Sequence, residues 1–188
     1  MLIIMTYTPE ERLAAHREKS RMIRRLPLEQ AVQYVNGPVY GLVEEVFDLQ
    51  YTSPWLNSSR MQDGHDMDSL KLVYLSPRYE QYKGSCGLTF GVLTQLAPKD
   101  MRPHFSTVRR VASDLDRGHR LIAKDATFSI DGKNFKGDVT HYTAPVRYSF
   151  FTLYHERIRL TGEAAGPSIE EFIQILQSLH VLNGKAVE

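Results

Sequence analysis

Apolar and polar residues alternate along the C-terminal fifth of the chain, from Val146 toward Leu182. The alternation over residues 146–161 predicts one long strand with a single buried face. Phe151 and Leu153 interrupt the polar face, so we expect another element to cover its middle. The apolar face of the predicted strand consists of Val146, Tyr148, Phe150, Tyr154, Ile158 and Leu160.

A helix is predicted directly after this strand. Gly166-Pro167 breaks the chain, and Ser168 with Glu171 has the spacing of a capping box. Apolar residues then recur at helical spacing as far as Asn183-Gly184, where glycine favours a helix end. We therefore expect residues 183–188 to add little to stability. The apolar stripe consists of Ile169, Phe172, Ile173, Leu176 and Leu179, with Ile175 and Leu182 at its edge.

The rest of the chain contains two more predicted helices and a series of strands. Thr8, Pro9 and Glu11 start the first helix with a capping box, and this helix extends to about Arg25. A second, short helix is predicted over Leu28–Val35. The remaining predicted elements are strands over 39–51, 70–75, 87–96, 107–112, 120–130 and 133–142, a polar loop over 57–68, and a tight turn at Asp131-Gly132.

Strands that follow one another without intervening helices imply an antiparallel sheet. The predicted fold class is α+β: a single twisted antiparallel sheet of about six or seven strands, with the N-terminal helices and the C-terminal helix packed on one face. At 188 residues the chain is long enough for one sizeable core and short for two domains. We predict a basic helical arm over residues 1–26 and a single α+β domain over residues 27–188.

Three segments carry a pattern of short helix, strand and closing helix: "PLEQAVQYVNGPVYGL", "LKLVYL" and "RIRLTGEAAGPSIEEFIQILQSL". This succession resembles bacterial anti-sigma-factor-like domains of unknown function. Those domains resemble in turn the lipoprotein-carrier type of curved antiparallel sheet with helices on one side. The resemblance is mainly to the C-terminal strand and helix. It implies a curved sheet and supplies no catalytic residues.

Composition narrows the partners that we expect. The net charge is only +1, which does not favour nucleic acid as a partner. Cys86 is the single cysteine, so an internal disulfide and an all-cysteine metal site are excluded. No apolar run approaches the ~20 residues of a membrane-spanning helix. We therefore predict a cytoplasmic protein without a membrane span.

The first helix is strongly basic, with six lysine or arginine residues and one acid between positions 12 and 25. One interpretation is a helix that binds an acidic protein, a membrane surface or nucleic acid. The other is a solvated surface helix whose thin stripe docks on the body, with Leu13, Met22 and Ile23 burying little. Acidic residues concentrate between Glu44 and Asp68, so the helix could clamp across residues 44–48 or bind a second molecule. Its candidate partner-binding residues are Arg12, Arg17, Arg21 and Arg24.

Two further groups are candidates for ligand or partner binding. Residues 133–142 and the long strand are expected to pair, which would gather a patch that binds an anion through arginine. The alternative is an ordinary polar sheet face. This patch consists of His141, Tyr142, Arg147, His155 and Arg157. Separately, Trp55 follows Pro54 and is either an exposed contact residue or a buried anchor for its loop.

Two groups of residues raise the possibility of catalysis. Asp63–Asp68 holds three carboxylates and a histidine, which could bind a hard cation, although the spacing does not fit a calcium loop. The alternative is a solvated loop. Cys86 could act as a nucleophile with His104, His141 or His155 as base, or simply fill space in the core. The sequence matches no phosphate-binding loop or hydrolase motif, and we assign no catalytic residue, metal or cofactor.

Taken together, the sequence favours a non-enzymatic binding or regulatory interaction module. The expected partner is another protein or a second copy of the chain. A carrier that holds an apolar small molecule between sheet and helices is the first alternative. A small enzyme that uses the acidic loop or the sheet histidines is the second.

Overall fold

The computed structural model describes residues 8–60, 66–76, 88–96, 120–143 and 147–186. Three helices and nine strands form within these residues. In chain order they are α1 (Pro9–Ile23), α2 (Leu28–Ala31), β1 (Tyr40–Leu42), β2 (Gln50–Arg60), β3 (Asp66–Ser76), β4 (Leu88–Leu96), β5 (Arg120–Ile130), β6 (Lys133–Tyr142), β7 (Tyr148–His155), β8 (Ile158–Ala165), α3 (Ile169–Gln177) and β9 (Leu179–Val181).

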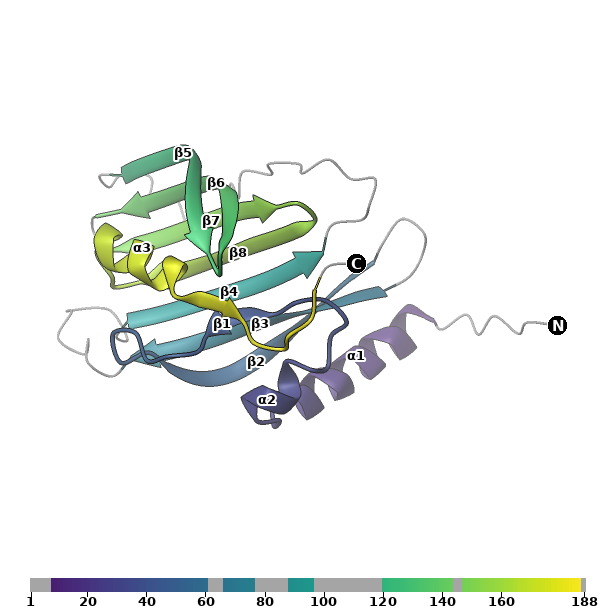
Figure 1. The fold of residues 1–188 in the computed structure, drawn as a ribbon. Helices are drawn as coiled ribbons and strands as arrows, with labels where there is room; N and C mark the ends of the chain where they lie inside the picture. The colour runs from purple at the N-terminus through teal and green to yellow at the C-terminus, as the bar shows by residue number, and fades with distance from the viewer. Residues whose placement is uncertain (1–7, 61–65, 77–87, 97–119, 144–146, 187–188) are drawn as a thin grey trace.

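Seven of these strands form one antiparallel sheet in the order β2-β3-β4-β8-β7-β6-β5 (Figure 1). The predicted mixed fold with an antiparallel sheet is therefore confirmed. β1 and β9 form a separate two-stranded sheet, which the sequence did not predict. Each of these two strands is only three residues long, and that is too short for alternation to be recognised.

The two capping boxes predicted from the sequence are present. The backbone N–H of Glu11 donates to Thr8 Oγ1 at 3.2 Å, and the Thr8 N–H donates to the Glu11 carboxylate at 2.8 Å. Ser168 and Glu171 make the same reciprocal pair at the start of α3, with the same two distances. Each pair satisfies N–H groups that the first turn of a helix leaves without a partner.

The prediction of one long strand over residues 146–161 is wrong, because the chain reverses at Glu156. This residue has a positive φ of 50°, and His155 pairs with Ile158 across the turn. The most deeply buried residues occupy odd positions before the turn and even positions after it, since a two-residue connection pairs odd with even numbers. Phe151 and Leu153, which interrupted the supposed polar face, are core residues exposed by 3% and 0%.

Other element boundaries also differ from the prediction. Residues 39–51 divide into β1 and the start of β2, with a connection over residues 43–49. The predicted loop over 57–68 belongs largely to β2 and β3, which pair Ser58 with Asp68. α2 ends at Ala31 and α3 ends at Gln177, in both cases earlier than predicted, and β9 follows α3. The predicted strand over 107–112 lies outside the described residues.

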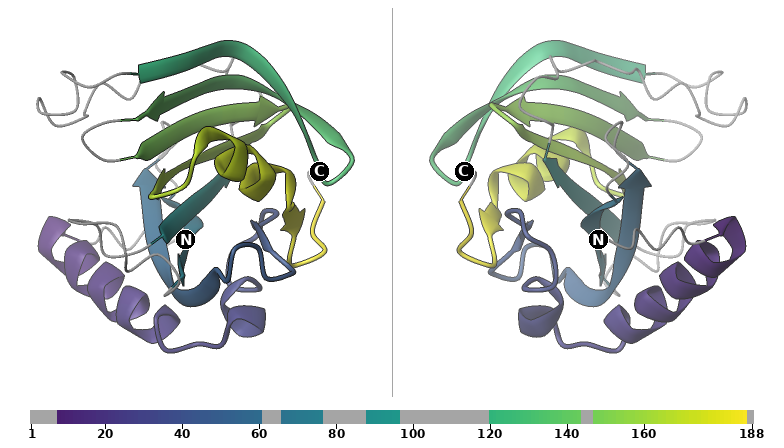
Figure 2. Two further views of the ribbon diagram at one scale, coloured as in Figure 1. Left: turned by 90° about the vertical axis from the view of Figure 1, so that its left-hand side faces the viewer. Right: turned by 90° about the vertical axis from the view of Figure 1, so that its right-hand side faces the viewer.

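A row of aromatic rings crosses the core from β2 to α3. Neighbouring ring centroids lie 6.0 Å apart for Tyr51 and Tyr74, 6.2 Å for Tyr74 and Phe90, 6.2 Å for Phe90 and Phe151, and 5.8 Å for Phe151 and Phe172. These distances are typical of interacting aromatic pairs. Figure 2 shows the sheet curving around α3, which contributes the last ring of the row.

Gly162 permits a close approach of neighbouring strands in this core. A Cβ atom at this position would lie 2.1 Å from the carbonyl oxygen of Gly91 and 2.6 Å from the Phe151 ring. At Gly91 the nearest atom to an added Cβ would be Lys71 Cε at 2.8 Å, which belongs to a flexible side chain. Two glycines on adjacent strands therefore differ sharply in the space around them.

We expect Gly162→Ala to lower the free energy of unfolding by about 3 kcal/mol, because backbone and ring would both have to move. The matched variant Gly91→Ala should cost about 1 kcal/mol or less, because the lysine can swing aside. Urea unfolding measures both values. Equal effects of the two variants would contradict the close packing at Gly162.

The C-terminal segment is held by Asn183, contrary to the expectation that residues 183–188 add little. Asn183 is 9% exposed, and its amide donates to the carbonyls of Val32 and Gly37, each at 2.9 Å. Its side-chain oxygen accepts from the Val39 N–H at 3.2 Å. Lys185 Nζ adds a hydrogen bond to the Val35 carbonyl at 2.6 Å. The segment therefore fastens the connection between α2 and β1.

We expect Asn183→Ala to lower the free energy of unfolding by about 3 kcal/mol, because it leaves several buried backbone groups without hydrogen-bond partners. Asn134→Ala is the control, since Asn134 is exposed and should change stability by about 0.5 kcal/mol at most. Thermal and urea unfolding test the pair. Similar melting of both variants would show that the segment is not held in this way.

Candidate functional site

α1 meets the rest of the molecule through a mainly polar side. The less exposed positions of the helix are 12, 16, 19, 20 and 23, and this spacing places them on one side. Ile23 alone is fully buried, at 0% exposure. Leu13 and Met22 are 49% and 46% exposed. The expectation of weak burial is therefore confirmed for Leu13 and Met22 and wrong for Ile23.

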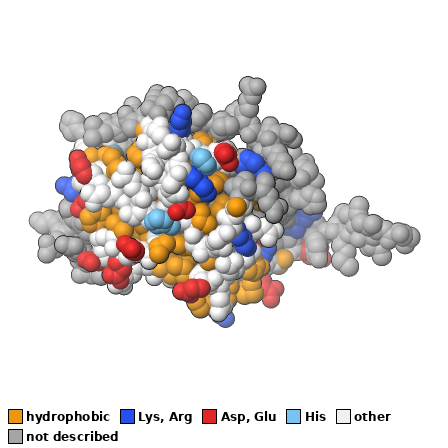
Figure 3. All heavy atoms as spheres, viewed as in Figure 1, with side chains coloured by type: hydrophobic (Ala, Val, Ile, Leu, Met, Phe, Trp, Pro, Cys, Tyr) orange, Lys and Arg blue, Asp and Glu red, His pale blue; other side chains and the backbone are white. Residues whose placement is uncertain are grey.

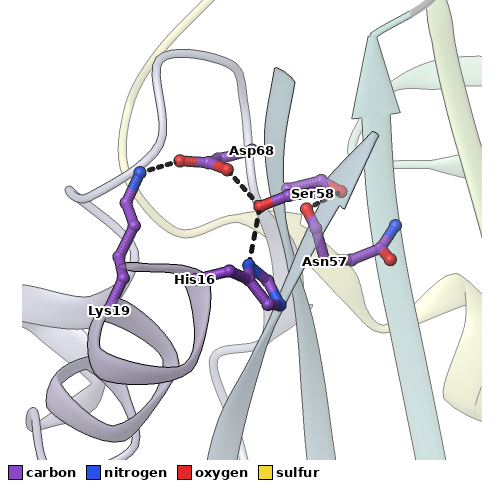
Figure 4. Close-up of polar contacts among 6 residues, drawn as sticks. His16, Lys19, Asn57, Ser58 and Asp68 are labelled. Carbon is purple, nitrogen blue, oxygen red and sulfur yellow. Dashed lines mark hydrogen bonds and ion pairs between the residues drawn. The ribbon is translucent and has the colours of Figure 1, made fainter. Parts of the chain in front are cut away.

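Two polar contacts join α1 to the β2–β3 hairpin, and a third links the two hairpin residues that they use (Figure 4). Lys19 forms an ion pair with Asp68, and Ser58 Oγ donates to the same carboxylate at 2.5 Å. His16 Nδ1 lies 3.2 Å from Ser58 Oγ. Burial acts to lower the pKa of Lys19, but the hydrogen bond and charge of Asp68 outweigh it and raise that pKa. Polar contacts thus hold the helix beside the end of the hairpin.

The proton arrangement at this junction argues against a serine nucleophile. A hydroxyl carries one proton, and Ser58 gives its proton to the acceptor-only carboxylate of Asp68. His16 Nδ1 must therefore donate to Ser58 Oγ, whereas a catalytic histidine would have to accept the serine proton. The junction is an attachment, and its residues were not predicted from the sequence. The helical spacing of positions 12, 16, 19 and 23 was the available signal.

Another side of α1 carries a row of arginines that ends at its C-cap residue, Arg24. Arg17, Arg21 and Arg24 follow the i, i+4, i+7 spacing and are exposed. Within the part of the chain that the structure describes, the side chains of Arg17 and Arg21 have no hydrogen-bond or ion-pair partner. Arg12 lies on the inner side and is partly exposed. Three of the four predicted arginines therefore share one surface.

Trp55 extends this row onto the sheet. The Arg24 guanidinium carbon lies 3.9 Å from the centroid of the Trp55 ring, which is a cation–π contact. The tryptophan is nevertheless 48% exposed. The interpretation of Trp55 as an exposed contact residue therefore fits the structure better than a buried anchor.

The exposed large hydrophobic residues of the described chain are confined to the elements around β2. Across the described residues they are Leu13, Met22, Val43, Trp55 and Leu75. All five belong to α1, the β1–β2 connection, β2 or β3, and β2 is the edge strand of the sheet. We call the exposed side chains of these four elements, with the arginine row, the β2 edge surface.

The predicted His–Tyr–Arg patch does not form a single site. β6 and β7 pair as expected, but His155 contacts Phe135 and the Asn134 carbonyl at the start of β6. His141 lies six residues further along β6, about 20 Å away at the usual rise per residue. His141, Tyr142 and Arg147 therefore lie at one end of the sheet. His155 and Arg157 lie at the other end.

His141 is buried rather than exposed to a ligand. It is 2% exposed, and its Nδ1 lies 2.7 Å from Ser149 Oγ. Burial and the nearby positive charge of Arg147 lower its pKa below the ordinary 6.5, while Glu170 acts in the opposite direction. A neutral, hydrogen-bonded histidine of this kind belongs to the packing of the core.

The other chemical candidates lie mostly outside the described residues. The structure does not describe Cys86, His104 or residues 63–65. Asp68 forms the ion pair with Lys19 at the α1 junction. Within the described ranges, no three histidine, cysteine or acidic side chains are grouped so that they could hold a metal ion. None of the described helices is long and apolar enough to cross a membrane.

We expect the free energy of unfolding to fall as the pH drops below about 6.5, because the folded protein binds a proton at His141 less readily than the unfolded chain. His141→Asn keeps a hydrogen-bonding atom near Ser149 and removes this titration. Urea unfolding between about pH 7.5 and pH 5 should show a shallower pH dependence for this variant. Parallel profiles of parent and variant would contradict the assignment.

Comparisons of the chain with protein-family models, with curated proteins and with solved structures found no match. The resemblance to anti-sigma-factor-like domains therefore stays a prediction. Any assignment of function rests on the geometry of the β2 edge surface.

Proposed function

We propose that this protein is a non-enzymatic interaction module that binds an acidic protein partner through the β2 edge surface. The observation that carries the proposal is that the half-exposed Trp55 lies against Arg24 of the arginine row, within the elements that hold all five exposed large hydrophobic residues of the described chain. Contiguous exposed apolar surface marks interaction sites, and tryptophan and arginine contribute much of the binding energy at such sites.

The charge of the surface indicates an acidic partner. Residues 12–25 hold six basic side chains and one acid in a chain whose net charge is +1. Arg17 and Arg21 are separated by one helical turn, about 6 Å along the axis, so neighbouring carboxylates of a partner can reach both. Such pairs steer association and make it sensitive to salt.

The two alternatives have less support from the described residues. A carrier needs a cavity between the sheet and helices that pack on one of its faces. The aromatic row from Tyr51 to Phe172 fills the described part of that space with side chains. The enzyme alternative depends on the acidic loop, of which residues 63–65 are not described, or on His141, which is buried, and His155, which lies at the other end of the sheet.

Trp55 is the only tryptophan of the chain, so its fluorescence reports directly on this surface. We expect a polyglutamate peptide to change the Trp55 emission at about 0.1 M salt and to lose affinity at about 1 M salt. Arg17→Gln with Arg21→Gln should weaken binding about fivefold. Lys136→Gln with Arg157→Gln removes the same charge elsewhere and should change the dissociation constant less than about twofold.

Equal weakening by the two double variants would show that binding depends on net charge alone. A peptide that leaves the tryptophan emission unchanged would place any binding elsewhere. Either result would contradict the proposed surface. Circular dichroism of each variant establishes first that the fold is retained.

A further inference from the structure

The β2 edge surface also has an acidic end. The β1–β2 connection exposes Val43 by 64%, and Glu44 and Glu45 beside it are exposed. Figure 3 shows acidic side chains gathered at the lower left of the molecule, over this connection. Figure 1 shows that the connection and the first turns of α1 lie toward opposite ends of β2. We call residues 43–45 the acidic end and the arginine row with Trp55 the basic end.

The two ends do not neutralise each other inside one molecule. Contacts of α1 reach Trp55, Ser58 and Asp68, not residues 44–48, so the helix does not clamp across the acidic end as one sequence interpretation had it. Five residues of extended strand separate Gln50 from Trp55, about 17 Å. This exceeds the screening length of about 8 Å at physiological salt. Both charged groups therefore remain available to another molecule.

The acidic end is held in a fixed conformation. Phe47 and Asp48 both have positive φ, 52° and 55°, and the Leu49 N–H donates to the Val46 carbonyl at 3.0 Å. This is a tight turn built without glycine, which is unfavourable unless packing holds it. Val46 and Phe47 pack against the core and supply that packing. The turn thus points its apolar side inward and leaves Val43 and the glutamates outward.

We propose that the partner of the edge surface is a second copy of this chain, in an antiparallel arrangement about a twofold axis that crosses β2 between Gln50 and Trp55. This inference rests on the proposed interaction function and names its partner. A twofold rotation about that axis places the basic end of each copy opposite the acidic end of the other. Both contacts then form twice, and the assembly closes as a dimer.

The middle of the edge favours contact through side chains. Pro54 lies in the middle of β2 and has no N–H to give to a strand of another molecule. A sheet that continued from one copy into the other would be interrupted there. Trp55 and Leu75, at 48% and 41% exposure, are the apolar side chains that the second copy would cover.

Sedimentation equilibrium of the full chain tests the arrangement. At about 0.1 M salt we expect a concentration-dependent species of twice the 21.6 kDa chain mass, which dissociates at about 1 M salt. Glu44→Lys with Glu45→Lys makes both ends basic, and Arg17→Glu with Arg21→Glu makes both ends acidic. Each double variant alone should associate at least about tenfold more weakly than the parent.

Charge complementarity then predicts two rescues. An equimolar mixture of the two double variants should form a heterodimer, because each end of one now meets an opposite charge on the other. The variant that carries all four substitutions should recover self-association. Lys136→Glu with Arg157→Glu, which changes the same charge away from the edge, should leave the parent association unchanged.

A chain that stays monomeric at every concentration and low salt would overturn the dimer. So would a dimer that ignores the charge reversals, a mixture that does not associate, or a series of species larger than the dimer. If the polyglutamate peptide still binds at Trp55 in a monomeric chain, the proposed function stands with another acidic partner. If the peptide also fails, both proposals fall.

Discussion

The insertion of β8 between β4 and β7 holds the main sheet together. β2, β3 and β4 are neighbours in sequence order at one side, and β5, β6 and β7 at the other. β8 joins the two groups. Because Gly162 has no side chain, β8 can lie close to the backbone of Gly91, and the Phe151 ring packs over Gly162. The same ring stacks on Phe90 and contacts Phe172 of α3. One closely packed point therefore connects both halves of the sheet to the C-terminal helix.

β2 lies at one edge of this sheet, where the contact with α1 is less apolar than the core near α3. The side of the core near α3 is closed by aliphatic and aromatic side chains. At the far edge, α1 contributes a single buried residue, Ile23, and otherwise docks through His16 and Lys19. Exposed ion pairs of this kind contribute little, about 0–1 kcal/mol each. These contacts therefore fix the position of the helix but add little to the free energy of unfolding. The arginines on another side of the helix remain in solvent.

Local signals in the sequence predicted local structure well. The capping boxes at Thr8 and Ser168 and the turn at Asp131 depend on neighbours within a few residues, and all three were confirmed. The β7–β8 turn was missed because residues 156–157 contain no glycine to indicate a turn. Apolar residues also occur at both odd and even positions around it, so the change of face was not visible. β9 was read as helix because Leu179 and Leu182 continue the helical spacing, while only β1, far away in sequence, favours a strand there.

The candidate site, too, depends on contacts between residues far apart in sequence, which local patterns do not predict. Charge counts revealed that basic and acidic residues concentrate in separate stretches, and they identified Arg17, Arg21 and Arg24. They could not reveal that Asp68, one of the acids, would be used by Lys19, or that Trp55 would lie against Arg24. Those contacts depend on the pairing of residues 57–60 of β2 with residues 66–69 of β3, and the polar composition of these residues had predicted a loop. Once that hairpin is in place, α1 is fixed beside its end and the acidic connection is left at the other. The separation of charge along one edge is thus a consequence of strand pairing, and it is the basis on which we propose a second copy of the chain as the partner.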